Sequence, residues 1–242
     1  MQKVAIITGA SRGIGAATAK LLAQNNYAVC VNYHRAQEKA EAIVAEIQQN
    51  KGRAIAVKAN LAEEQAILRL FEIVDNQLGP VHALINNAGI NGGVCELEQI
   101  TLDRLQQVFA TNVFGTFLAC REAVKRMKNN GGNIVNISSE AARFGGTQLA
   151  HYAASKAAIN TLTIGFAREV AAYGIRVNTV SPGVIDTELH QASSPDRIAN
   201  LIKTLPMGRM GSTTEVAELI LWLLSDAASY ISGAIIPITG GR

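Results

Sequence analysis

Tyr152 and Lys156 lie four residues apart in the chain and together could carry acid–base chemistry. On one helix they would share a face, with about 5–6 Å between their Cβ atoms. A free phenol has a pKa of about 10, and a nearby ammonium favours the phenolate, so we expect Lys156 to lower the pKa of Tyr152. Tyr152 could then act as a general acid or base near neutral pH, while Ser139, just past an apolar run, could hold a substrate oxygen. An exposed amphipathic helix turn would show the same Tyr–Lys spacing.

A glycine-rich turn near the N-terminus has the features of a phosphate site. It reads Thr8-Gly9-Ala10-Ser11-Arg12-Gly13-Ile14-Gly15, between an apolar strand and a helical stretch. Glycine lets the backbone approach a pyrophosphate, and a helix N-terminus offers free N–H groups and a positive dipole end. The spacing is Gly-x-x-x-Gly-x-Gly, not the commonest dinucleotide fingerprint, and an ordinary tight turn is the alternative. The candidate phosphate-binding residues are Gly9, Ser11, Arg12, Gly13, Ile14 and Gly15.

The end of the second predicted strand bears on which nicotinamide cofactor binds. An NAD site usually has an Asp or Glu there for the ribose hydroxyls, whereas this chain has Tyr33, His34 and Arg35. No carboxylate repels a 2′-phosphate at this point, and Arg35 with Arg12 could bind one by charge-assisted hydrogen bonds. The sequence therefore favours NADP(H) over NAD(H), although Arg35 could equally be a solvated loop residue.

Polar and turn-forming residues follow three further predicted strands. Asn60-Leu61 could meet an adenine edge, or Asn60 could cap the helix that follows. Asn86-Asn87-Ala88-Gly89 could border a cofactor and lock neighbouring loops, or simply form a turn. Pro182-Gly183 fixes a sharp turn, where backbone groups could meet a nicotinamide.

Strand-like and helix-like runs alternate along the chain and must position these residues. The strands are expected at 3–8, 27–33, 53–59, 81–85, 134–137, 175–180 and 234–238, and the helices at 16–23, 37–49, 62–77, 101–129, 149–172, 197–203 and 215–224. Apolar strands separated by helices predict an α/β fold, a doubly wound (Rossmann) parallel sheet of about seven strands with helices on both faces. Ligands bind outside the carboxyl ends of such strands, where every motif above falls. We expect one domain, residues 1–242, with a substrate lid at about 188–206.

Asn112 stands in the middle of the long predicted helix at 101–129. Asn is a poor residue for a helix interior, so Asn112 indicates either a bend or polar network near the site, or a satisfied core amide. The apolar residues around it that we expect to be buried are Phe109, Val113, Phe117 and Leu118.

Composition excludes several classes of function. The chain has 242 residues, 48% apolar and 17% charged, with a net charge of +3. No long basic run suggests nucleic-acid binding, and no apolar run approaches the roughly 20 residues of a membrane span. Cys30, Cys95 and Cys120 fit neither a metal site nor a disulfide framework. With no signal-peptide pattern at the start, the expected location is cytoplasmic.

Jointly the motifs resemble the short-chain dehydrogenase/reductase family in its single-domain form, over essentially the whole chain. The resemblance rests on Thr8-Gly9-x-x-x-Gly13-Ile14-Gly15, Asn86-Asn87-Ala88-Gly89, Asn112, Ser139, Tyr152-x-x-x-Lys156 and Pro182-Gly183, in that order. It implies a catalytic tetrad in which Tyr152 exchanges a proton with the substrate oxygen and Ser139 holds that oxygen. It also implies that Lys156 binds the nicotinamide ribose and lowers the Tyr152 pKa, and that Asn112 keeps a water for a proton relay.

The resemblance also implies which residues outside the glycine-rich turn contact the cofactor. Family members commonly have Asp at the position of Asn60, so the adenine contact is expected to be weaker here, and Thr187 matches a position that contacts the carboxamide. A homotetramer, or a dimer, built from long-helix faces is implied as well. The implied cofactor-binding residues are Tyr33, His34, Arg35, Asn60, Leu61, Asn87, Ala88, Gly89, Tyr152, Lys156, Pro182, Gly183, Val184, Ile185 and Thr187.

Three functions remain open from the sequence. The first is an NADP(H)-dependent oxidoreductase of a small carbonyl or sugar-like alcohol, similar to glucose-dehydrogenase-like members, with the substrate pocket lined by 90–97 and the lid. The second is a 3-oxoacyl-[acyl-carrier-protein] reductase, whose acidic carrier needs a basic rim. Lys125, Arg126 and Lys128 could supply that rim, while Tyr173, where that branch often has a basic residue, counts against it. The third is a catalytically silent NADP(H)-sensing or interaction protein, against which the complete tetrad argues.

Overall fold

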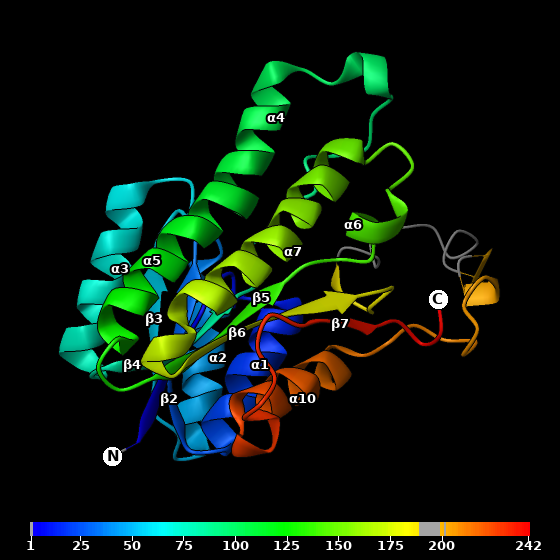
Figure 1. Cartoon of the computed structure of the whole chain (residues 1–242). Helices are drawn as coiled ribbons and strands as arrows, with labels where there is room; N and C mark the ends of the chain where they lie inside the picture. The colour runs from blue at the N-terminus through cyan, green and yellow to red at the C-terminus, as the bar shows by residue number, and fades with distance from the viewer. Residues whose placement is uncertain (1, 189–198, 201) are drawn as a thin grey trace.

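A seven-stranded parallel sheet forms the centre of the protein (Figure 1). The computed structural model describes residues 2–188, 199–200 and 202–242. The strand order is β3-β2-β1-β4-β5-β6-β7, and every neighbouring pair is parallel. The predicted doubly wound α/β fold is confirmed. The strands are β1 (Lys3–Ile7), β2 (Tyr27–Tyr33), β3 (Ala54–Lys58), β4 (Val81–Asn86), β5 (Gly132–Ile137), β6 (Ile175–Pro182) and β7 (Ile235–Ile238).

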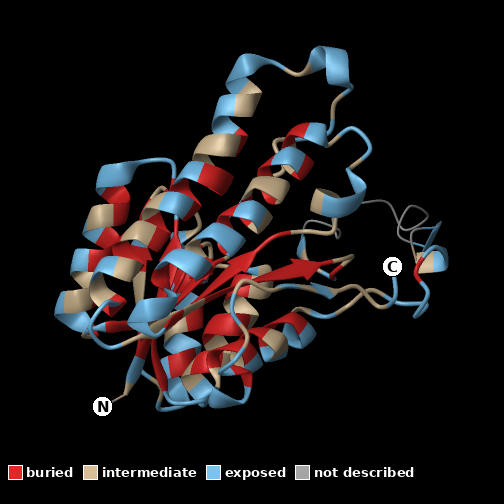
Figure 2. Cartoon of the chain, in the orientation of Figure 1, coloured by how far each residue is buried: buried red, intermediate tan, exposed pale blue. Residues whose placement is uncertain are grey.

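Helices cover both faces of the sheet because alternate strand residues point to opposite sides. On one face, Val4 and Ile6 of β1 pack with α3 (Glu64–Gln77), α5 (Gly115–Met127) and α7 (Ala150–Val170). On the other face, Ala5 and Ile7 pack with α1 (Gly13–Gln24), α2 (Gln37–Gln49) and α10 (Thr213–Leu224). Figure 2 shows the result, with buried strands between helices that are buried only on their inner sides.

Shorter helical segments lie between these elements. They are α4 (Leu102–Phe109), α6 (Ala141–Phe144), the π-turn η2 (Ala110–Phe114) and the 3₁₀ turns η1 (Leu97–Gln99), η3 (Ala171–Tyr173) and η4 (Asp226–Ala228). Most of the predicted lid at 188–206 lies outside the described residues, but residues 199–200 and 202–203 of the helix predicted at 197–203 are described and are helical. Of the helices that are described, none has the length and apolar character needed to cross a membrane.

The long helix expected at 101–129 is present, but it is interrupted by the π-turn. α4, η2 and α5 follow one another without a break, with Asn112 inside the π-turn. Val113 is buried as predicted, whereas the prediction for Phe117 is wrong because that side chain is 45% exposed. A π-turn adds one residue to a helical turn and rotates everything after it by about 100°. The inner face of α5 is therefore lined by other residues, Ala119, Cys120, Ala123 and Met127.

Candidate active site

The sequence motifs converge on the carboxyl edge of the sheet. The glycine-rich turn follows β1, Asn87 and Gly89 follow β4, Ser139 follows β5, and Gly183 follows β6. β1 and β4 are neighbours, yet the chain continues from β1 towards β2 and from β4 towards β5. This reversal is the switch point at which doubly wound folds bind nucleotides.

Hydrogen bonds lock the loops after β1 and β4 together. The Thr8 hydroxyl accepts from the N–H groups of Asn87 and Ala88, each at 3.0 Å. The Asn87 amide donates to the carbonyls of Thr8 and Gly9, also at 3.0 Å. Gly9 has φ +61°, and a Cβ there would come within 2.8 Å of the Ala88 Cα. Only glycine fits this position, so the predicted interlocking of these loops is seen directly.

Asn32 adds a further tie that the sequence reasoning missed. Its side chain is buried at the end of β2, where its oxygen accepts from the Gly9 N–H at 3.1 Å. Its amide donates to the carbonyls of Val57 and Ala59, each at 3.2 Å. The available signal was an amide in an otherwise apolar strand, because a buried polar group must be paired.

The start of α1 fits the pyrophosphate of a dinucleotide. Arg12 occupies the N-cap position, and no described side chain accepts from the first-turn N–H groups there, so a phosphate could accept from them. Gly13 has φ +56°, and a Cβ on it would lie 3.6 Å from the Thr187 methyl carbon. A Cβ on Gly15 would collide with the Asn87 amide at 2.5 Å. Gly9 and Gly15 thus let the glycine-rich turn pack closely against the loop after β4.

The adenosine end of the site is framed by β2 and the segment after β3. Tyr33 is buried, whereas His34 and Arg35 after it are exposed. Asn60 accepts from the Ala62 N–H at 3.2 Å and donates to the Glu63 carboxylate at 2.8 Å. The Asn60 amide therefore supports the turn before α3, the alternative to adenine binding that the sequence left open.

Lys156 is buried on α7, and its ammonium donates to the carbonyl of Ile137 at 2.7 Å. Its nitrogen lies 5.8 Å from the centre of the Tyr152 ring. The Tyr152 phenol forms a hydrogen bond with the Ser139 hydroxyl, and that hydroxyl also accepts from the Ala141 N–H at 3.1 Å. The predicted spacing thus brings Ser139, Tyr152 and Lys156 into one group of neighbours.

The predicted effect of Lys156 on the Tyr152 pKa is wrong in this structure. Burial raises the pKa of Tyr152 above its ordinary 10.0, and the hydrogen bond with Ser139 lowers it only in part. Burial also lowers the pKa of Lys156 to about 8. The reason is that desolvation disfavours both charged forms, while the ammonium is directed at the Ile137 carbonyl.

Asn112 joins the same group through the loop that follows β4. Its oxygen accepts from the Ile90 N–H at 2.8 Å, and its amide donates to the Ile90 carbonyl at 2.9 Å and the Ser155 hydroxyl at 3.0 Å. A Cβ on Gly89 would lie 3.3 Å from the Asn112 oxygen and 3.4 Å from the Lys156 nitrogen. Asn112 is therefore both the polar network that its position indicated and a close neighbour of Lys156.

The predicted substrate segment, 90–97, is fixed to α7 by two residues that the sequence reasoning missed. The His151 Nε2 donates to the Asn91 carbonyl at 2.8 Å, and the Gln148 carbonyl accepts from the Cys95 N–H at 3.0 Å. His151 is buried directly before Tyr152, and its Nδ1 has no hydrogen-bond partner in the described chain. A histidine beside an apolar helix face gives no sequence signal of such a distant contact.

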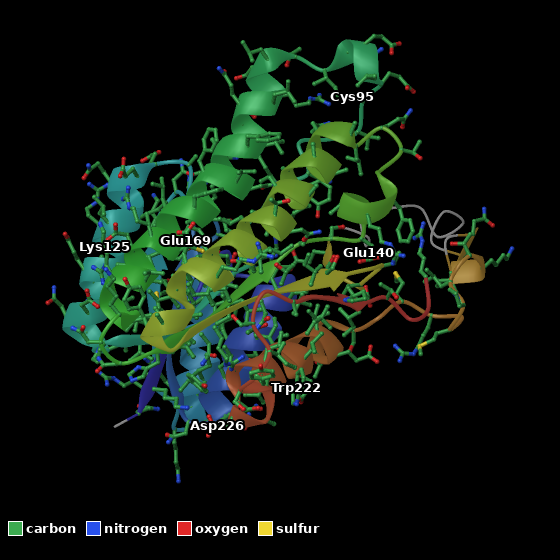
Figure 3. All side chains as sticks on the ribbon, viewed as in Figure 1. Cys95, Lys125, Glu140, Glu169, Trp222 and Asp226 are labelled. Atoms are coloured by element: carbon green, nitrogen blue, oxygen red, sulfur yellow. The ribbon has the colours of Figure 1, made fainter. Side chains whose placement is uncertain are left out.

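The end of β6 borders the site from the other side. The Pro182 carbonyl accepts from the Glu140 N–H at 3.0 Å, and Gly183 donates to the Ile238 carbonyl at 2.9 Å. Val184 and Gly211 are hydrogen-bonded at 3.0 Å, and Ile185 is buried. Figure 3 shows Glu140 at this edge of the sheet, with Cys95 on the loop beyond it. Nowhere in residues 2–188, 199–200 and 202–242 do three His, Cys, Asp or Glu side chains gather as a metal site would require.

Comparison with known proteins agrees with this geometry. The family model described as short chain dehydrogenase matches residues 3–198. "Uncharacterized oxidoreductase YgfF" of Escherichia coli is 48% identical over 245 residues, covering 99% of each chain. "3-oxoacyl-[acyl-carrier-protein] reductase FabG" of Staphylococcus aureus is 37% identical over 242 residues, covering 100% of this chain and 98% of that one. A mutant short-chain dehydrogenase/reductase of Serratia marcescens has a similar structure, with a TM-score of 0.93 and 35% identity over 99% of this chain and 97% of that one.

Proposed function

The chain belongs to the short-chain dehydrogenase/reductase family, and on that premise we propose that it is an NADP(H)-dependent oxidoreductase. It transfers a hydride between the nicotinamide and a small carbonyl or alcohol substrate. The observation that supports this proposal best is the contiguous group of Asn112, Lys156, Tyr152 and Ser139 beside the glycine-rich turn. These are the side chains that a proton transfer next to a bound nicotinamide requires.

Tyr152 is the proposed acid and base. The nicotinamide, when bound, supplies the hydride chemistry, and Tyr152 gives its phenolic proton to the substrate oxygen in the reducing direction. Its raised pKa favours the protonated form at neutral pH, which is the form that a general acid needs. Ser139, already hydrogen-bonded to the phenol, holds the same substrate oxygen.

Lys156 and Asn112 support the proton transfer from the other side. The buried Lys156 ammonium binds the nicotinamide ribose. A water between the Lys156 nitrogen and the Asn112 oxygen, which flank Gly89, would return a proton from solvent. Burial lowers the pKa of Lys156 to about 8, so Lys156 can exchange a proton at a pH close to neutral.

The proposed cofactor site follows the carboxyl edge of the sheet from β2 to β6. The pyrophosphate lies on the turn after β1 and the start of α1, the adenosine at the ends of β2 and β3, and the nicotinamide at the ends of β4 and β6. The proposed contacts are Gly9, Ser11, Arg12, Gly13, Ile14, Gly15, Tyr33, His34, Arg35, Asn60, Leu61, Asn87, Ala88, Gly89, Tyr152, Lys156, Pro182, Gly183, Val184, Ile185 and Thr187.

The function is tested with Tyr152→Phe and the control Tyr230→Phe, since the Tyr230 side chain is fully exposed. Purified protein is screened for NADPH oxidation with small ketones, aldehydes and sugars, and for NADP⁺ reduction with alcohols. Tyr152→Phe should lose about 10²- to 10⁴-fold in turnover, the usual contribution of general acid–base catalysis, while still binding NADPH. A wild type that binds NADPH yet turns over nothing would instead favour the silent NADP(H)-binding protein.

Reduction of a 3-oxoacyl thioester is the alternative substrate assignment, favoured by the 37% identity to FabG over the whole chain. The basic rim expected for an acidic carrier is largely paired, however. Lys125 and Arg126 bond to the Glu122 carboxylate, and the Lys128 ammonium lies 4.8 Å from the centre of the Tyr173 ring. We therefore propose the small carbonyl first. NADPH oxidation with an acetoacetyl thioester tests the alternative, which inactivity would remove.

A homotetramer, or a dimer, is the proposed assembly, with residues 1–242 folding as one domain in each subunit. The support is an apolar groove between α5 and α7, lined in part by Phe117, Leu118, Val124 and Phe166. The rings of Phe117 and Phe166 are 5.7 Å apart, and Phe117 is largely exposed. Light scattering should show more than one subunit for the wild type and a smaller particle for Phe117→Arg.

A further inference from the structure

We propose that His151 is a positioning residue for the substrate. It fixes the segment 90–97 against α7, so that this segment forms one wall of the substrate pocket beside Tyr152. Loss of the His151 bond should therefore weaken substrate binding and leave cofactor binding unchanged. This inference rests on the proposed function, because it concerns the pocket of the same enzyme, and His151 takes no part in the proton transfer or the cofactor contacts proposed above.

Two neighbouring carbonyls of the segment are held by buried side chains from different helices. The Asn91 carbonyl accepts from the His151 Nε2 at 2.8 Å, and the Ile90 carbonyl accepts from the Asn112 amide at 2.9 Å. The Asn112 amide also donates to the Ser155 hydroxyl at 3.0 Å, and Ser155 lies one turn after His151 on α7. These bonds, the loop clamp, form a closed ring from α7 through the segment and the π-turn and back to α7.

The bond to Asn91 is the one polar contact of the His151 ring among the described residues. A carbonyl oxygen only accepts, so the His151 Nε2 must carry the proton of this bond. The Nδ1 on the other side of the ring is buried and has no partner in the part of the chain that the structure describes. Burying an imidazole with one nitrogen unpaired costs free energy, which indicates that the side chain is kept for its bond to the segment.

Gly92 lets the segment come this close to α7. It has φ +73°, and a Cβ on it would lie 2.5 Å from a methyl carbon of Val108 and 3.0 Å from the His151 Nε2. Val108 on α4 and His151 on α7 are both buried, and side chains in a close-packed interior do not move aside easily. The segment therefore passes through a narrow space between the two helices that only glycine fits.

The loop clamp lies directly beside the proposed acid and base. His151 immediately precedes Tyr152 in α7, and the Tyr152 carbonyl accepts from the Ser155 hydroxyl at 2.7 Å. The held segment exposes two large apolar side chains, Ile90 and Val94, which offer an apolar surface to the substrate. A shift of the segment would move this surface while α7 keeps the phenol in place, and larger substrates should feel the shift more.

The experiment compares His151→Leu, which removes the donor, with His151→Gln, whose amide nitrogen can take the place of Nε2. His151→Asn is a further control, because its shorter amide reaches only as far as Nδ1. Gly92→Ala opens the loop clamp from the side of the segment, and Gly93→Ala is its matched control. Gly93 also has a positive φ, +81°, but a Cβ on it would meet only an Arg104 nitrogen, at 4.0 Å.

Hydrogen exchange measured by mass spectrometry reports how firmly the segment is held, without substrate or cofactor. His151→Leu, His151→Asn and Gly92→Ala should speed exchange across 90–97 by about two- to tenfold, the range for the net loss of one hydrogen bond. The bond from the Cys95 N–H to the Gln148 carbonyl joins backbone atoms and remains, which limits the effect. His151→Gln and Gly93→Ala should stay within about twofold of wild type, and exchange in β5 should be the same in all five variants.

Steady-state kinetics then tests the consequence for the pocket, with NADPH and each ketone or aldehyde that the wild type reduces in the screen above. His151→Leu should raise KM about two- to tenfold and leave kcat within about twofold, because a lost binding contact that leaves the acid in place acts on KM. The rise in KM should grow with the size of the carbonyl compound, and His151→Gln should reverse it. The Kd for NADPH should not change.

The inference is overturned if His151→Leu leaves exchange across 90–97 unchanged, or if His151→Asn restores wild-type behaviour and His151→Gln does not. A loss in kcat alone would place His151 in the proton transfer and would also overturn it. If His151→Leu does not fold, the difference between Gly92→Ala and Gly93→Ala decides in its place. A wild type that reduces none of the carbonyl compounds would contradict the proposed function itself, while the exchange rates would still show whether His151 holds the segment.

Discussion

The Lys156 ammonium is tied to the sheet, 2.7 Å from the Ile137 carbonyl at the end of β5, while its nitrogen stays 5.8 Å from the centre of the Tyr152 ring. This carbonyl gives the buried ammonium a hydrogen-bond partner that does not titrate. The bond to Ile137 therefore fixes the position of the Lys156 ammonium, and no bond to the Tyr152 phenol is needed for this. Burial is left as the main influence on the ionisation of both side chains.

The phenol of Tyr152 should stay protonated up to pH 10 in protein without nucleotide. Its pKa is raised above 10.0, first by burial, with Ser139 opposing only in part. An absorbance titration of wild type minus Tyr152→Phe isolates the phenolate signal of this residue. The signal should appear above pH 10, and a phenolate that forms near neutral pH would contradict the structure.

Lys156 should make the protein more stable as the pH rises through its depressed pKa. The folded-state pKa is about 8 against an ordinary 10.5, so between these values the unfolded chain binds more protons than the folded one. Stability then increases with pH. Relative to Lys156→Met, wild type should gain roughly 2–3 kcal/mol as the pH rises from about 8 to 10. Urea unfolding across this range measures the gain, and parallel pH dependences of the two proteins would refute it.

Asn112 should contribute to stability as well as to any activity. Asn112→Ala leaves the Ile90 N–H and carbonyl without the part-buried bonds seen here, and a buried group left unpaired costs about 1–3 kcal/mol. Urea unfolding should therefore show a loss of about 2–4 kcal/mol. Asn112→Asp keeps the acceptor for the Ile90 N–H and should rescue part of that loss. Equal losses in the two variants would mean that the amide bonds to Ile90 matter little.

Gly9→Ala should destabilise the protein more than Gly79→Ala. Both glycines have positive φ, +61° and +104°, so both variants carry backbone strain. A Cβ on Gly9 would also lie 2.8 Å from the Ala88 Cα, whereas one on Gly79 meets nothing within 4 Å. The overpacking should add about 1–3 kcal/mol in thermal or urea unfolding, together with weaker NADPH binding. Equal effects would show that the loops after β1 and β4 separate easily.

Cys95 should be the only thiol that reacts quickly in the native protein. Burial raises the pKa of the Cys30 thiol, and it raises that of Cys120 to about 12, although a bond with Asn86 opposes it. Cys95 is partly exposed on the loop after β4. A thiol reagent should label one of the three cysteines in native protein and all three in urea. Fast labelling that persists in Cys95→Ser would contradict this assignment.

The fold could be predicted because its signals are local. Apolar strand runs such as Val4–Ile7 and the glycine-rich turn between β1 and α1 need no knowledge of distant residues. The same holds for the spacing of Tyr152 and Lys156, which one helix converts into proximity. The roles of these residues and the NADP(H) preference remain predictions.

Other features depend on contacts between distant segments. The exposure of Phe117 follows from a π-turn that Asn112 stabilises through Ile90, 22 residues earlier. The Lys156 ammonium donates to the Ile137 carbonyl on β5 and not to the nearby phenol. Asn32 and His151 likewise form hydrogen bonds with backbone groups of distant loops. A periodicity of 3.6 or 2 residues carries no information about such partners.

The π-turn has an evolutionary consequence for this chain. It makes α4 and α5 two helices out of phase, so a single-residue deletion within Ala110–Phe114 would restore a regular helix and turn α4 by about 100° about its axis. α5, which packs on the sheet, could keep its inner residues, while α4 would turn a different set of side chains towards its neighbours. One codon would thus separate two registers of the same helix, and the bonds of Asn112 to Ile90 depend on which register is present.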